Sequence, residues 1–223
     1  KIMKMRALYL IFTAIILGMT GSHAQGVLNL ENNVRFGLAI SGHNSHIRGI
    51  HNQSLGRYAP AFGIYTQINL IPNKTMQGIS TAKIYFVAQV EYSMEGEKTK
   101  FKTGEINKYI YDYINIPMYI KYNFGFGQGA KPNFMIMGGP MASFSVYQNY
   151  VGDKTLEREV VQIAHSNFKK FSFGASVGIG YRFIPQLEGY FRYDHGFTKV
   201  YGNYDKHNTY KYFLAAGLNW FFN

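Results

Sequence analysis

Apolar and polar residues alternate along most of the chain, in eight stretches separated by polar or turn-forming segments. A side-chain period of two is that of a β-strand with one apolar face. In the last stretch, residues 210–223, that face consists of Tyr212, Leu214, Ala216, Leu218, Trp220 and Phe222. The alternation therefore predicts an all-β chain.

Most of the predicted strands are long enough to cross a membrane. Their residue ranges are 34–41, 61–70, 84–94, 114–124, 134–146, 171–183, 187–197 and 210–223. A tilted strand needs about 9–11 residues to span a bilayer. Residues 134–146 are apolar on both faces, so the sequence leaves the register of that strand open.

The connections between these strands alternate in character. Those after the first, third, fifth and seventh strands are long and carry charged residues, for example residues 42–57 and 95–108, whereas those after the fourth and sixth are short. Outer-membrane barrels have long external loops and short periplasmic turns. The pattern predicts an eight-stranded antiparallel transmembrane up-and-down β-barrel, and a soluble secreted β-sandwich stays open as an alternative.

The amino terminus has the layout of a secretory signal peptide. Basic residues precede an apolar run, residues 7–17, and small residues follow it as far as Ala24. The run is shorter than the roughly 20 apolar residues of a membrane-spanning helix. We expect cleavage after Ala24, which gives a signal peptide at residues 1–24 and a barrel domain at residues 25–223; an uncleaved anchor is the alternative.

Composition agrees with an exported β protein. The 223 residues include 19 tyrosines, 18 phenylalanines and 24 glycines against six prolines, which favours β structure over disorder. The absence of cysteine excludes disulfides, thiolate chemistry and lipid attachment to a processed cysteine. The net charge is +11, but export makes nucleic acid an improbable partner.

The faces opposite the apolar ones carry polar side chains that would fill the inside of a barrel. The charged members are Arg35, Glu91, Lys121, Arg182, Glu188, Arg192 and Asp194. Unpaired charges away from water are costly, so we expect these groups to pair with one another or with trapped water. An eight-stranded barrel is just wide enough for side chains. The prediction is a structural network that fills the barrel, with a gate or proton path as the functional alternative.

Candidate chemistry is sparse. His43, His46 and His51 lie close in sequence, but no carboxylate lies near them, so we expect solvated loop histidines and no metal site. Ser172 and Ser176 face the predicted interior, whereas the parity of His195 turns it to lipid. No Ser–His–acid set converges, and we predict neither an enzyme nor a cofactor.

Several short segments resemble the PorT-like outer-membrane β-barrels of Bacteroidota. Residues 114–122, INIPMYIKY, resemble the family stretch L-x-I-P-L-x-x-K-Y, and residues 36–44, 174–181 and 192–197 resemble its first, sixth and seventh strands. The resemblance implies an eight-stranded outer-membrane barrel of a group commonly described as porin-like. The family's namesake serves a protein-secretion and gliding-motility apparatus, but no functional residue carries over.

The closing strand also resembles a sorting signal. Gly217, Trp220 and Phe222 have the spacing of the carboxy-terminal signal by which outer-membrane barrels are recognised, which implies the barrel-assembly machinery as a partner. Basic residues in the predicted loops suit the phosphate-rich surface of lipopolysaccharide, and outer-membrane lipid is the expected surrounding.

The sequence thus predicts a non-enzymatic outer-membrane barrel. It would act through external loops or as a component of an envelope assembly, for which a protein-secretion system is one candidate. A narrow porin that passes ions or small solutes is the first alternative. The second is the secreted β-sandwich, acting as a soluble binding protein.

Overall fold

The computed structural model describes residues 34–47, 54–70, 83–125, 133–152, 167–202 and 209–222. Their strands are β1 (Val34–Ile47), β2 (Ser54–Asn69), β3 (Lys83–Lys100), β4 (Ile106–Phe124), β5 (Phe134–Val151), β6 (Phe171–Ile184), β7 (Leu187–Gly196) and β8 (Lys211–Phe221). Within these ranges no helix is long and apolar enough to cross a membrane.

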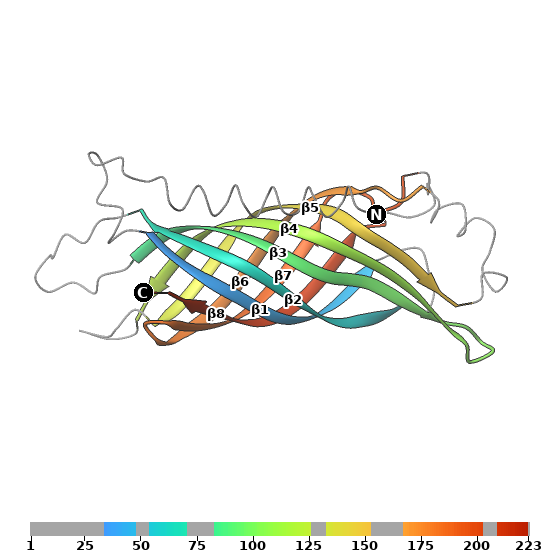
Figure 1. Cartoon of the computed structure of the whole chain (residues 1–223), viewed down its shortest axis with the longest axis horizontal. Coiled ribbons are helices and arrows are strands. Elements are labelled where there is room, and N and C mark those ends of the chain that lie inside the picture. The colour runs from blue at the N-terminus through green and yellow to red at the C-terminus, as the bar shows by residue number, and fades with distance from the viewer. Residues whose placement is uncertain are drawn as a thin grey trace, which may run out of the picture. The chain divides into compact units, whose positions relative to one another are not determined.

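Consecutive strands pair antiparallel, and β8 pairs with β1, so the sheet closes into an eight-stranded barrel (Figure 1). The predicted fold is confirmed. The β-sandwich alternative is wrong, because a sandwich consists of two separate sheets. The barrel unit comprises Asn33–Asn223, and the predicted signal peptide lies outside the described residues.

The strand period puts polar side chains inside and apolar ones outside. On β4, Lys121 and Asn123 are fully buried in the barrel. Ile120, the residue before Lys121, is 52% exposed on the outer wall. On β6, Val177 and Ile179 are likewise exposed. An apolar outer wall around a polar interior is the arrangement of a membrane barrel.

Strand β6 is rich in glycine because its inward positions make room for methionines of β5. Met135 lies opposite Gly180, and Met137 lies opposite Gly178. A Cβ atom added to Gly178 would lie 2.8 Å from Met137 Cε and 2.7 Å from the carbonyl oxygen of Phe191. The missing side chains therefore allow both the filling of the interior and the close approach of the strands.

Two segments that the sequence predicts as loops are largely strand. β1 and β2 extend far into residues 42–57, and β3 and β4 cover residues 95–108 except for the tip at 101–105. The β3–β4 hairpin projects from one end of the barrel (Figure 1). That prediction was wrong because a strand beyond the membrane keeps its backbone pairing while both of its faces become polar.

The first test concerns the position of the wall in the membrane. Val177 is 57% exposed near the middle of β6, and Ile106 is 45% exposed on the projecting hairpin. We expect Val177→Arg to cost about 2–4 kcal/mol in free energy of unfolding, because it places a charge in lipid. The matched Ile106→Arg should cost about 1 kcal/mol or less, since it stays in water and faces only Lys100 across the hairpin. Denaturant unfolding in lipid vesicles measures both, and equal costs would contradict the assignment.

Candidate functional site

The middle of the lumen is organised by Arg192, which is 1% exposed. Its Nη2 atom lies 2.8 Å from Glu91 Oε1, and its Nε atom lies 2.6 Å from Asp194 Oδ2. Nη1 donates to the hydroxyl of Tyr119 at 3.0 Å. The carboxylates have further donors, since Gln89 donates to Glu91 at 2.8 Å. One guanidinium thus joins β3, β4 and β7 across the barrel.

A second group of charges lies near the end of the barrel that carries the short β6–β7 turn. The carboxylate of Glu188 forms ion pairs with Lys121 Nζ at 2.8 Å and with Arg182 Nη2 at 2.6 Å. Lys121 Nζ also donates to the hydroxyl of Tyr65 at 3.2 Å. Arg35 is the one predicted network member without a carboxylate partner in the described residues; it donates instead to a backbone carbonyl.

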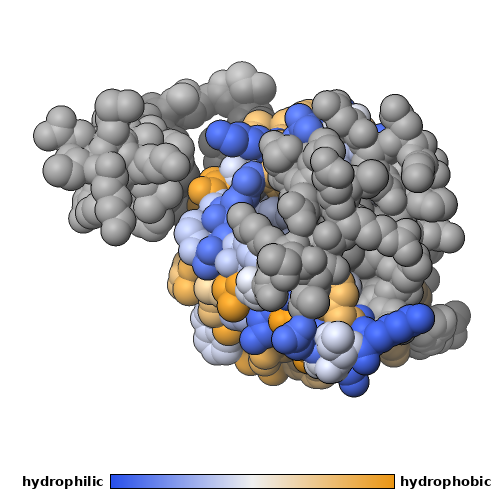
Figure 2. Space-filling model, turned by 90° about the vertical axis from the view of Figure 1, so that its right-hand side faces the viewer, coloured by the Kyte–Doolittle hydropathy of each residue, from blue (hydrophilic) through white to orange (hydrophobic). Residues whose placement is uncertain are grey.

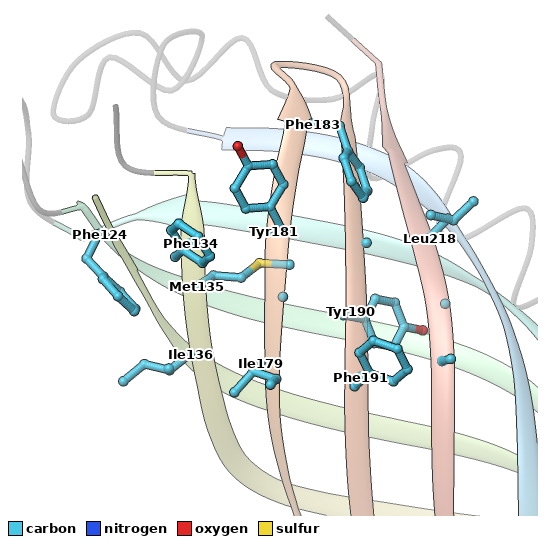
Figure 3. Close-up of a pocket in the computed structure, with 14 residues that line it drawn as sticks. Phe124, Phe134, Met135, Ile136, Ile179, Tyr181, Phe183, Tyr190, Phe191 and Leu218 are labelled. Carbon is cyan, nitrogen blue, oxygen red and sulfur yellow. The ribbon is translucent and has the colours of Figure 1, made fainter. Parts of the chain in front are cut away.

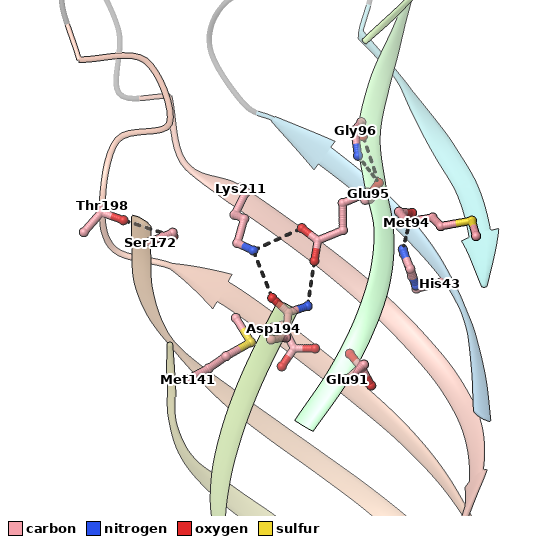
Figure 4. Close-up of polar contacts among 12 residues, drawn as sticks. His43, Glu91, Met94, Glu95, Gly96, Met141, Ser172, Asp194, Thr198 and Lys211 are labelled. Atoms are coloured by element: carbon pink, nitrogen blue, oxygen red, sulfur yellow. Dashed lines mark hydrogen bonds and ion pairs between the residues drawn. The ribbon is translucent and has the colours of Figure 1, made fainter. Parts of the chain in front are cut away.

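A third group lies nearer the projecting hairpin and was missed from the sequence. Lys211 Nζ lies 3.1 Å from Glu95 Oε2, and Asn115 donates to Glu95 Oε1 at 2.7 Å (Figure 4). The ammonium also sits 3.8 Å above the centre of the Tyr113 ring. The sequence pattern puts Glu95 in the connection at residues 95–108, and it puts Lys211 within the predicted strand 210–223 without assigning it to the interior network. The continued alternation Glu91, Ser93, Glu95 was the available signal, because it keeps every second residue of β3 inward.

An aromatic cluster covers the lumen at the same end. Tyr201, which is 0% exposed, shares a hydrogen bond of 2.9 Å with the hydroxyl of Tyr111. Phe168 stacks on the Tyr111 ring with 4.4 Å between ring centres. These residues lie above the membrane-crossing part of the strands, and burial raises the pKa of both tyrosine hydroxyls. We call Tyr111, Tyr113, Phe168 and Tyr201 the aromatic cap.

The lumen is filled rather than open. Lys121, Glu188 and Asp194 are all 0% exposed, and so are the neutral Asn115 and Ser176. A continuous water-filled channel would leave the side chains that line it accessible to water. The described interior therefore offers packing and ion pairing, and it offers no passage along these residues.

The barrel wall has a local interruption between β2 and β3. Residues 57–60 make no ladder pairs with β3. Side chains take over the freed backbone groups, since His43 Nε2 lies 2.9 Å from the carbonyl oxygen of Met94 and Arg57 donates to that of Glu95. Buried backbone groups require such partners, so these side chains close the seam.

The prediction of a solvated loop histidine is wrong for His43, which lies buried within β1, and His43 and His46 do not form a shared metal site. His43 is 3% exposed and points into the lumen, where its ring lies 5.2 Å from that of Phe213. His46 points to the outer side of the same strand and stacks on Tyr212. The two therefore cannot share an ion, and His51 lies outside the described residues.

The candidate nucleophiles are also occupied. Ser176 donates to Asp194, and Ser172 accepts a hydrogen bond of 3.0 Å from Thr198. His195 contacts the Tyr193 hydroxyl at 3.2 Å on the outer face. Among the hydrogen bonds of the described strands, none joins a histidine to either serine, so no Ser–His–acid set forms there.

The predicted assembly signal lies at the seam of β8 and β1. Trp220 and Phe222 are 50% and 53% exposed on the outer wall. Gly217 faces inward, and a Cβ atom there would lie 2.6 Å from the Tyr190 hydroxyl and from the Ile40 carbonyl oxygen. Glycine at this position thus leaves space for the Tyr190 ring.

An apolar groove of about 700 Å³ lies on the outer wall rather than in the lumen. Its rim includes Phe134, Tyr181, Phe183 and Leu218, and Gly189 leaves the space between them (Figure 3). The groove faces the lipid and offers no charged side chain. It therefore has the chemistry of a lipid-facing surface and lacks that of a catalytic site.

A family model described as outer membrane protein beta-barrel domain matches residues 23–202. Among solved structures, Neisserial surface protein A shares 12% identity over 85% of this chain and 97% of its own, with a TM-score of 0.37. Ail of Yersinia pestis shares 7% over 85% and 98%, with a TM-score of 0.39. OprG of Pseudomonas aeruginosa shares 9% over 85% and 94%, with a TM-score of 0.35. No curated protein matches the chain.

The second test concerns the central ion network. We expect Arg192→Leu to lower the free energy of unfolding by about 3–5 kcal/mol, because it leaves Glu91 and Asp194 buried without a cation. Adding Glu91→Gln and Asp194→Asn should recover much of that loss, since no buried charge then remains unpaired. The exposed Lys108→Leu serves as the control, at about 0.5 kcal/mol or less. Unaltered stability of Arg192→Leu would contradict the network.

Proposed function

The chain belongs to the outer membrane protein beta-barrel domain family, and from that premise we propose that it is a closed, non-enzymatic barrel that acts at its external end. The filled lumen supports this proposal, because it leaves the surface as the place of interaction. The partner proposed for that surface is lipopolysaccharide, whose phosphates lie at the level of the projecting strands.

One observation carries the choice of partner. Lys98 on β3 lies directly opposite Lys108 on β4, and Lys100 follows on the same outward face. Like charges facing each other across two strands are destabilising. In the described part of the hairpin no carboxylate lies within ion-pair distance of these lysines, and Glu105 is bonded to Thr103 instead. An anionic surface would offset this repulsion.

The lysine pair belongs to the projecting β3–β4 hairpin, which we call the basic arm, residues 97–108. Its inward face is buried, with Glu97 at 0% and Asn107 at 1% exposed, so the lysines form the accessible face. Figure 2 looks onto this end of the molecule and shows hydrophilic side chains there. The arm therefore presents fixed positive charge beyond the membrane.

Several further predictions remain proposals. A narrow porin is disfavoured by the buried charges of the lumen, and an enzyme by the occupied serines. Membership of the PorT-like group, a role in a secretion assembly and removal of residues 1–24 rest on the sequence resemblance and layout. Recognition by the barrel-assembly machinery is supported by the exposed aromatic side chains at the end of β8.

The third test uses the opposed lysines. Lys98→Glu should stabilise the hairpin in neutral detergent by about 0.2–1 kcal/mol, because it converts a repulsive pair into an attractive one. The same change should lower the affinity for lipopolysaccharide by about tenfold. Less lipopolysaccharide should therefore remain bound after size-exclusion chromatography. Opposite effects on stability and on binding are the signature of the proposal.

The control is Lys170→Glu, which changes the net charge equally and is exposed off the arm. We expect it to retain lipopolysaccharide nearly as the unaltered protein does. Equal losses in both variants would show a general charge effect, and undiminished binding in Lys98→Glu would refute the role of the arm.

A further inference from the structure

The periplasmic mouth of the lumen carries more positive than negative charge among the described residues. The two-residue turn between β6 and β7 marks this end as periplasmic. Lys121 and Arg182 share the carboxylate of Glu188. Arg35 adds a third cation, and its hydrogen bond goes to the carbonyl oxygen of Pro185 at 2.6 Å. The described part of the mouth therefore holds three cations and one carboxylate, and Arg35 makes no ion pair with that carboxylate.

The surplus charge is concentrated at one place. The ring of Phe221 lies 4.2 Å from the Arg35 guanidinium carbon and 5.6 Å from Lys121 Nζ. Pro185, which accepts the hydrogen bond from Arg35, lies in the turn between the strands that carry Arg182 and Glu188. Like charges this close repel strongly where little water screens them. The cluster therefore lacks negative charge to balance its cations.

The same place also has buried donors without acceptors. Gln67 pairs with Arg35 in the β1–β2 ladder and is 1% exposed. Its Oε1 atom accepts from Lys121, whereas its Nε2 atom has no partner. Asn123, two residues beyond Lys121 on β4, is 0% exposed, and its Nδ2 donor and its Oδ1 acceptor are both unpartnered. Buried amide donors normally have an acceptor.

We propose that this mouth binds a phosphate group, with Arg35 as its principal ligand and the Gln67 amide as a second donor. A phosphate supplies what the cluster lacks, namely negative charge and several acceptor oxygens. The planar guanidinium matches such an oxyanion through paired N–H donors. Arg35 is partly exposed, so the site is reachable from the periplasm. The group comes either from free phosphate or from a phospholipid headgroup of the inner leaflet.

The experiment uses the full chain refolded in neutral detergent and measures the melting temperature by circular dichroism. Sodium phosphate is compared with sodium chloride at equal ionic strength, which separates binding from screening. In a second arm, phosphatidylglycerol is added to the same micelles without free phosphate. We expect the melting temperature to rise in a saturable way in at least one arm, because a ligand of the folded state stabilises it.

The variants identify the site. Arg35→Gln should abolish the rise, Arg35→Lys should retain part of it, and Lys170→Gln, exposed at the opposite end and off the basic arm, should retain all of it. For each variant, the melting temperature with ligand is compared with that of the same variant without ligand. A change in the basal stability of a variant therefore does not affect the result. A rise with free phosphate identifies a free oxyanion, and a rise with phosphatidylglycerol alone identifies a headgroup. No rise in either arm, an equal rise with chloride, or an undiminished rise in Arg35→Gln would overturn the proposal.

Discussion

The structure depends on the pairing of charges that cannot reach water. A buried ion without a partner costs several kcal/mol, and a barrel interior inside a membrane offers little solvent to reduce that cost. Arg192 meets this requirement by contacting Glu91, a residue 101 positions earlier in the chain, and Lys211 meets it with Glu95, 116 positions earlier. Each pair joins β3 to one of the last two strands across the lumen, so the pairing links parts of the barrel that are far apart in the sequence.

This requirement explains the rest of the interior and directs attention to the two ends. Methionines of β5 over glycines of β6 fill the space that the ion groups leave, and the aromatic cap covers the lumen beyond them. Among the described residues, the cations without a matching number of carboxylates lie at the ends. The basic arm holds opposed lysines outside the membrane, and the periplasmic mouth holds three cations around Glu188. Both ends carry positive charge, and in an outer membrane both face phosphate-bearing surfaces.

Much of this arrangement is predictable from the sequence. Strict alternation on β6 is sufficient to assign its faces, because one face must contact lipid and the other must not. The charged residues of the interior follow from the same parity. Their partners do not follow, since parity says which way Lys121 points but not that it meets Glu188 from a strand 67 positions away. Pairing across the barrel depends on the stagger of the strands, which alternation leaves undetermined.

The errors have a common physical origin. Glu95 was assigned to a connection because hydropathy was taken to mark the ends of strands, and hydropathy marks only the ends of the lipid-facing part. The replacement of ladder hydrogen bonds by His43 and Arg57 has no sequence signal beyond the polar character of residues 42–57. Both features arise where the wall leaves the membrane and backbone pairing continues in water.

The central claim is that the paired charges close the lumen. Single-channel recording of the refolded protein in a planar lipid bilayer tests it most directly, with protein-free bilayers and a known open porin as references. A filled lumen predicts no steady current at any holding voltage, apart from brief events also seen without protein. A reproducible, ohmic unit conductance that scales with the amount of inserted protein would contradict the account and would favour the narrow porin.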